Sequence, residues 1–235
     1  MDLCELSVLC VERRVMKLRR SFYQRSTLDV ARELLGKVLV RRRRGVVTSG
    51  VIVEVEAYVG ESDPACHAAP GPTRRNEPLY GPPGIAYVYL NYGIHSLVNV
   101  VTEPAGSPAA VLIRALDPVD GIAVMRRRRG RGMKGRRTID ASSLAVHDLC
   151  RGPGNVTMAM AIALADNRTD LLGDEIFIDD RRLTIGPIAW GPRIGIRVGT
   201  DRLWRAYLAG HPAVSATNGP AAAAASALRQ PGIER

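Results

Sequence analysis

The stretch VIVEVEAYVG, residues 51–60, carries two carboxylates and a phenol at alternating positions. Successive side chains of a β-strand point to opposite faces, so Glu54, Glu56 and Tyr58 would share one face of a strand here. If that face lines a cleft, one carboxylate can act as a general base that takes a proton from water. The alternative is an exposed face with solvated glutamates, because buried carboxylates without partners are costly.

The stretch YVYLNYGIH, residues 87–95, holds three of the chain's seven tyrosines, although aromatic residues make up only 5% of the sequence. Tyr87 and Tyr89 would share a strand face, and Tyr92-Gly93 lies where the chain must turn. A ring at the tip of a turn cannot pack in the core. On a basic surface it can wedge between stacked bases. The alternative is an exposed tyrosine without a role.

The charge of the chain favours a phosphate-bearing partner. The formal net charge is +10 and the isoelectric point is near 10.0. Nearly all of the excess is arginine, which can grip phosphate with a bidentate fork. The alternative is an arginine-rich composition without a binding role. The run RRRRGRGMKGRR, residues 126–137, is predicted to be a mobile basic loop that is either solvated or phosphate-binding.

The sequence predicts no metal site and no cofactor. The ligand-type residues show neither a CxxC pair nor a histidine spacing typical of a metal site, which argues against structural zinc and iron–sulfur clusters. Unpaired thiols fit a reducing compartment. These residues are Cys4, Cys10, Cys66, Cys150, His67, His95, His147 and His211.

The elements that would position these side chains alternate irregularly, which predicts one mixed α/β (α+β) domain. The loop over residues 60–84 is long enough to favour a function. The Arg41–Gly45 run is expected to be a solvated turn. The predicted helices span residues 28–35, 117–129 and 155–165, and the predicted strands span 37–42, 51–59, the hairpin 86–102, 111–116 and short segments up to 208.

The chain divides into a weakly patterned extension at residues 1–16, a main domain at 17–210 and a tail at 211–235 that is expected to be flexible. Neither a membrane-spanning run nor a secretory signal is evident. We therefore expect a cytoplasmic protein, associated with the nucleoid if the source is bacterial.

The segment from about Leu18 to Tyr207 resembles the alkyladenine (3-methyladenine) DNA glycosylase family. The matching motifs occur in the family's order with similar spacing: SFYQRSTLDVARELLGKVLV, VEVEAYVGESDPACHA, PTRRNEPLYGPPGIAYVYLNYGIHSLVNVV, AVLIRALDPVDG, LCRGPGNVTMAMAI and PRIGI. The resemblance implies a single domain around a curved, mostly antiparallel sheet with a protruding β-hairpin. It also implies a monomer that acts on double-stranded DNA containing damaged purines.

The family flips alkylated or deaminated purines out of the duplex and cleaves their glycosidic bond with water. By motif, Glu56 would be the general base, and Arg114 would help to hold the water and the carboxylate. Tyr58 and His67 would line one side of the flipped base and Tyr89 the other.

Two further roles follow from the resemblance. Asn99 would crowd the exocyclic amino group of normal guanine, and Tyr92 would plug the hole left in the duplex. Tyr87 is assigned to the core. The matched active-site motifs contain no lysine, so base excision without strand cleavage is expected. Ala68 stands where the family often has serine, and Leu97 beside the expected wall leaves the range of lesions open.

Two alternatives belong to other classes. A non-catalytic nucleic-acid-binding module would need neither Glu56 nor Arg114. A hydrolase of free nucleosides would need neither the +10 charge nor Tyr92.

Overall fold

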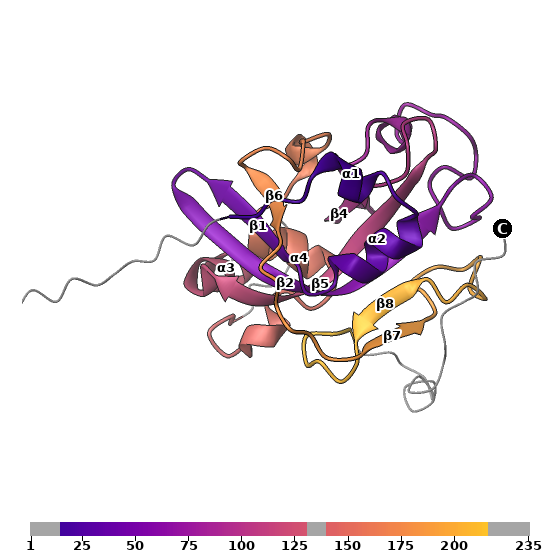
Figure 1. Cartoon of the computed structure of the whole chain (residues 1–235). Helices are drawn as coiled ribbons and strands as arrows, with labels where there is room; N and C mark the ends of the chain where they lie inside the picture. The colour runs from indigo at the N-terminus through magenta and orange to yellow at the C-terminus, as the bar shows by residue number, and fades with distance from the viewer. Residues whose placement is uncertain (1–14, 131–139, 216–235) are drawn as a thin grey trace, which may run out of the picture.

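The computed structural model describes residues 15–130 and 140–215, which form one domain around a curled antiparallel sheet of eight strands (Figure 1). Six strands follow the order β3-β4-β5-β2-β1-β6, and β8 pairs with both β2 and β7. The long strands β2 and β5 form the centre. The bounds are β1 (Val38–Arg43), β2 (Val46–Val59), β3 (Ala86–Asn91), β4 (His95–Val101), β5 (Ala109–Asp120), β6 (Ile176–Asp179), β7 (Ile188–Gly191) and β8 (Arg205–Leu208).

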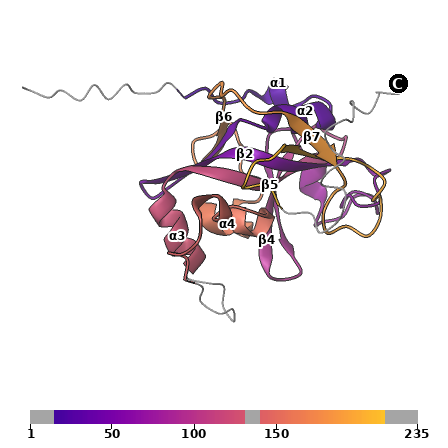
Figure 2. The same cartoon turned by 90° about the horizontal axis from the view of Figure 1, so that it is seen from below.

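Helices cover both faces of the sheet. Figure 2 shows α1 and α2 on one side and α3 and α4 on the other. Short 3₁₀ helices lie in the connections. The bounds are α1 (Arg20–Tyr23), α2 (Thr27–Leu34), α3 (Ile122–Gly130), α4 (Pro153–Met160), η1 (Glu77–Tyr80), η2 (Val146–Asp148) and η3 (Leu164–Asp166).

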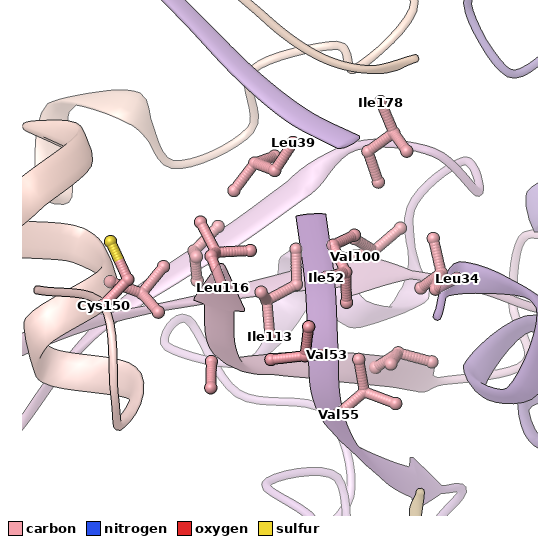
Figure 3. Packing of buried hydrophobic residues seen from close by; sticks show 14 of the residues in the cluster. Leu34, Leu39, Ile52, Val53, Val55, Val100, Ile113, Leu116, Cys150 and Ile178 are labelled. Carbon is pink, nitrogen blue, oxygen red and sulfur yellow. The ribbon is translucent and has the colours of Figure 1, made fainter. Parts of the chain in front are cut away.

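The core lies on both faces of β2. Ile52, Val53 and Val55 are all fully buried and pack with Leu34 of α2 and Ile113 of β5 (Figure 3). A strand covered on both faces carries a continuous apolar run in place of strict alternation. The valines and isoleucine of VIVEVEAYVG therefore contribute to one core on both sides of the strand.

The ladder between β2 and β5 is irregular beside the glutamates. Ile52 pairs with Leu116, Glu54 with Ala115 and Val55 with Ile113, so the register shifts on either side of Glu54. At these shifts Val53 of β2 and Arg114 of β5 have no pairing partner in the ladder. Such bulges bend a strand and re-aim side chains, and they are common next to active sites.

The hairpin of β3 and β4 projects from the sheet beside α4 (Figure 2). The Ile94 amide donates to the Asn91 carbonyl at 3.0 Å across its tip. Tyr92 and Gly93 both have positive φ, at 48° and 69°. The predicted hairpin, with its turn at Tyr92-Gly93, is confirmed.

Two predicted helices need correction. Residues 117–120 belong to β5, and α3 begins only after Gly121, whose φ of 75° turns the chain. The helix predicted up to Ala165 ends at Met160, because Ala161 adopts a left-handed φ of 53°.

The two arginine runs were also partly misassigned. Residues 126–130 form the last turns of α3 and not a loop, while 131–137 lie outside the described residues. In the first run, Arg41 is buried in β1 and pairs with Asp166 at 2.7 Å. Only Arg44 and Gly45 form the turn, both with positive φ.

The boundaries at the two ends stay predictions, and residues 1–14 and 216–235 lie outside the described part. Within it, Ala213 is fully buried and the Ser215 amide donates to Glu54 Oε2 at 3.0 Å. The helices within residues 15–130 and 140–215 are too short or too polar to span a bilayer.

Candidate active site

A cavity of about 360 Å³ lies along the hairpin of β3 and β4, between β5 and the loops around residues 65 and 195. Every predicted site residue except Glu56 lines it: Tyr58, His67, Tyr89, Tyr92, Asn99 and Arg114. The fold therefore brings together residues that the sequence separates by up to 56 positions, from Tyr58 to Arg114.

Glu56 lies directly behind the wall of this cavity. It is fully buried, and its Oε2 accepts a hydrogen bond from the Tyr58 hydroxyl at 2.9 Å. Its Oε1 accepts the Ile194 amide at 2.6 Å and lies 3.1 Å from Arg114 Nη1. All three donor residues line the cavity, so the carboxylate adjoins the space that they enclose.

Glu54 is also fully buried, and its partners differ. Its Oε1 accepts from Arg205 Nη1 at 2.9 Å and from Arg114 Nε at 3.3 Å, and its Oε2 accepts the Ser215 amide. Only Arg114 among these partners lines the cavity. The alternative of an exposed face with solvated glutamates is therefore wrong, since both carboxylates are buried and ion-paired.

Arg114 links the two carboxylates. Burial alone would lower the pKa of its guanidinium, but the charges of Glu56 and Glu54 outweigh burial and raise that pKa. Arg114 therefore stays cationic and holds Glu56 from the side of the cavity. Its position at the bulge of β5 explains how a strand residue reaches both glutamates.

The aromatic walls divide differently from the expectation. The rings of His67 and Tyr89 are in edge contact, with centroids 4.4 Å apart. A base between two rings needs two van der Waals contacts, or about 7 Å. His67 and Tyr89 therefore lie together in one wall of the cavity, and Tyr58 is another aromatic residue in its lining. Burial and the Glu56 carboxylate raise the pKa of the Tyr58 phenol, which keeps it a neutral donor.

Tyr87 is buried, as its assignment to the core requires, but it also lines the cavity. Its hydroxyl and His67 Nδ1 are hydrogen-bonded at 2.9 Å. Burial raises the pKa of Tyr87 to about 12. Burial and the nearby Arg75 lower the pKa of His67, so the imidazole is held neutral. The shared strand face of Tyr87 and Tyr89 was the signal that could have revealed this role.

Asn99 has a fixed orientation on β4. It is buried opposite Tyr87 in the ladder, and its side-chain amide donates to the Tyr87 carbonyl at 3.0 Å. Tyr92 has the opposite character: it is 82% exposed at the tip of the hairpin and also borders the cavity. The structure thus places one polar side chain within the cavity wall and one ring at its rim.

The donor from Ile194 was missed because it is a backbone amide, which side-chain patterns do not show. This amide lies in the motif PRIGI, residues 192–196, to which the sequence alone assigns no role. The motif brings Ile194, Gly195 and Ile196 to the cavity.

Comparisons with known proteins agree with this site. Residues 21–212 match the family model described as Methylpurine-DNA glycosylase (MPG). A protein of Rhodopseudomonas palustris (strain ATCC BAA-98 / CGA009) is 48% identical over 188 residues, which are 80% of this chain and 82% of that protein. One from Chlorobium phaeobacteroides (strain BS1) is 46% identical over 194 residues, with 82% and 92% covered.

A third relative, from Clostridium acetobutylicum, is 45% identical over 204 residues, with 85% of this chain and 98% of that protein covered. The names of all three include the words 3-methyladenine DNA glycosylase. The family model spans most of the chain, and the relatives are matched over most of their length. The chain therefore belongs to the methylpurine-DNA glycosylase family and is a DNA glycosylase of base-excision repair.

Proposed function

We propose that the protein flips an alkylated or deaminated purine from duplex DNA into the cavity and hydrolyses its N-glycosidic bond with a water activated by Glu56. The observation that carries this proposal is the buried carboxylate behind an aromatic-lined cavity. The volume of about 360 Å³ falls within the range that small-molecule sites occupy.

The aromatic walls suit a cationic base. A base stacked on a ring gains about 1–3 kcal/mol, and the face of an electron-rich ring attracts positive charge. Tyr58 and Tyr89 have raised pKa values because they are buried, so both remain neutral phenols. A neutral His67 adds no positive charge that would repel an alkylated purine.

Glu56 has room for one more hydrogen bond. An ionised carboxylate offers about four acceptor positions, and Tyr58, Ile194 and Arg114 use three. The fourth would accept a proton from water. The water oxygen would then bond to C1′ of the sugar, the C1′–N bond would break, and its electron pair would leave with the base. Because alkylation makes the base cationic, it departs neutral and needs less help from an acid.

Selectivity and flipping are assigned to two other residues. Asn99, fixed by its bond to the Tyr87 carbonyl, would crowd the exocyclic amino group of guanine. Tyr92 would enter the duplex where the base had been, because it is the exposed ring beside the cavity. None of the described residues that line the cavity is a lysine, which supports excision without an amine nucleophile.

The test is incubation with duplexes that hold one hypoxanthine, ethenoadenine or methyladenine, followed by alkali. We expect strand breaks at the lesion only after alkali treatment, which marks an abasic site. Breaks before alkali would show strand cleavage by the protein. Binding without alkali-labile sites on any duplex would favour the non-catalytic module, and release of base from free nucleosides would favour the nucleoside hydrolase.

A further inference from the structure

A buried ion pair outside the cavity joins two segments that the proposed mechanism leaves unexplained. Arg193 Nη1 donates to Asp63 Oδ2 at 2.5 Å and Nη2 donates to Oδ1 at 2.8 Å. Both side chains are completely buried. Such a bidentate arrangement fixes the relative orientation of its two partners, in addition to attracting them.

The Arg193 side of the pair acts on the surroundings of Glu56. Arg193 immediately precedes Ile194, the amide donor to Glu56 Oε1. Arg193 Nη1 also donates to the Ala57 carbonyl of β2 at 3.0 Å. Its guanidinium lies 4.7 Å from the centre of the Tyr58 ring, whose hydroxyl donates to Glu56 Oε2. Arg193 is thus linked to two of the three donors to Glu56. It adjoins Ile194 in the chain, and its guanidinium packs on the ring of Tyr58.

The Asp63 side of the pair shapes the loop that carries His67. The Asp63 carboxylate accepts the amides of Val59 at 3.3 Å and Ala65 at 3.2 Å, which closes a turn after β2. The Asp63 carbonyl accepts the Cys66 amide at 2.9 Å. Arg202 approaches the same carboxylate at 3.6 Å. The turn therefore delivers Cys66 and His67 to the cavity in a fixed direction.

We propose that Asp63 and Arg193 are positioning residues that lock the catalytic carboxylate and the base-binding wall into one geometry. This inference rests on the proposed function of Glu56. A buried ion pair by itself is weak evidence for stability, because apolar residues of similar volume often serve as well. Its use here would be to hold the Ile194 amide, Tyr58 and the His67 loop in register with one another.

The chain offers a matched control. Arg41 and Asp166 form another buried pair at 2.7 Å, and Asp166 also accepts a backbone amide, that of Ala163. Neither residue lines the cavity. Asp63→Asn and Asp166→Asn thus each remove one negative charge from a buried ion pair. Asp63 lies near the candidate active site, and Asp166 lies away from it.

The experiment measures three quantities for the wild type, Asp63→Asn, Arg193→Lys and Asp166→Asn. These are the thermal midpoint of unfolding, the single-turnover excision rate on whichever lesion duplex the wild type cleaves, and the affinity for a duplex with an abasic site. Both Asn variants should lower the midpoint. Of these two, only Asp63→Asn should slow excision, by about 10- to 100-fold, as expected for a misplaced catalytic group. Affinity for the abasic duplex should stay within a few-fold.

Arg193→Lys keeps the positive charge but cannot make the bidentate bond to Asp63. It should therefore slow excision, but less than Asp63→Asn does. If Asp63→Asn does not fold, Arg193→Lys tests the positioning role in its place. Excision at the wild-type rate by the folded variants, or an equal loss in Asp166→Asn, would overturn the positioning role while the proposed function stands. A wild type that excises no lesion would instead overturn the proposed function.

Discussion

Replacing Glu56 by glutamine removes the negative charge of the carboxylate and keeps the shape of the side chain. The amide oxygen can keep the bonds from Ile194 and Arg114, and the amide nitrogen would meet the Tyr58 hydroxyl, which would then accept in place of donating. The fold and the binding of lesion DNA should therefore survive. Excision should fall by about 10²- to 10⁴-fold, the usual loss of one general base. That is about 3–5 kcal/mol of activation free energy.

The loss of stability should be smaller than the loss of activity. Hydrogen bonds to charged groups contribute about 1.5–3 kcal/mol to stability and neutral ones about 0.5–1.5 kcal/mol. Replacing the carboxylate of Glu56 by an amide should therefore lower the free energy of unfolding by on the order of 1–3 kcal/mol. Arg114 keeps Glu54 as its counter-ion, so it is not left unpaired. Urea unfolding would measure this difference, and excision would be compared at a temperature where both proteins are folded.

Glu54→Gln is the control, because it makes the same chemical change on the neighbouring carboxylate. It weakens bonds from Arg205, Arg114 and the Ser215 amide, so its cost in stability should be similar or larger. Its effect on single-turnover excision should be smaller, since only one of these partners borders the cavity. Excision by Glu56→Gln within about threefold of wild type would refute the general-base role. A larger loss in Glu54→Gln would move that role to Glu54.

Three further outcomes are expected. Asn99→Ala should raise excision of guanine relative to a damaged purine, and an unchanged ratio would place selectivity elsewhere in the cavity. Tyr92→Ala should lose about 1–3 kcal/mol of stacking on paired lesions and less on mismatched ones. Tyr92→Gly, whose backbone adopts the positive φ of this position more easily, should lose as much excision as Tyr92→Ala. Equal losses on paired and mismatched duplexes would argue against the insertion of Tyr92 into the duplex. Burial lowers the folded-state pKa of His67, so the unfolded chain binds its proton more readily and stability should fall as the pH drops below about 6.5. Urea unfolding at pH 7.5 and 5.5 should show a smaller decrease for His67→Gln than for wild type.

Local patterns predicted those parts of the structure that local physics decides. Tyr92-Gly93 marked the turn of the hairpin, because a tight turn needs residues that tolerate positive φ. The alternation of residues 54, 56 and 58 placed Glu56 near Tyr58, and the two side chains are hydrogen-bonded. The helix at residues 28–35 was found within one residue of α2 because its apolar residues recur at helical spacing. Ser26 stands at the N-cap position without a side-chain bond to the helix.

Contacts between distant segments decided the rest. Residues 117–120 form strand because Ser49 and Gly50 of β2 pair with them, which outweighs their local helical pattern. Arg41 is buried because Asp166, 125 residues away, balances its charge. The side on which His67 lies depends on the path of a long loop, and that path depends on Asp63 and Arg193. Both residues lie within motifs quoted above, but no local pattern shows that they pair.

The bond between the Ile194 amide and Glu56 also bears on when the enzyme becomes competent during its synthesis. The two residues are 138 positions apart, and Glu54 meets Ser215 across 161 positions. Nascent chains grow at about 5–20 residues per second, and folds rich in such distant pairings form slowly. A chain still attached to the ribosome therefore has Glu56, the proposed general base, many seconds before it has the Ile194 amide that bonds to it. A base-removing enzyme built this way should not act on DNA until the segment up to about Ser215 has been made.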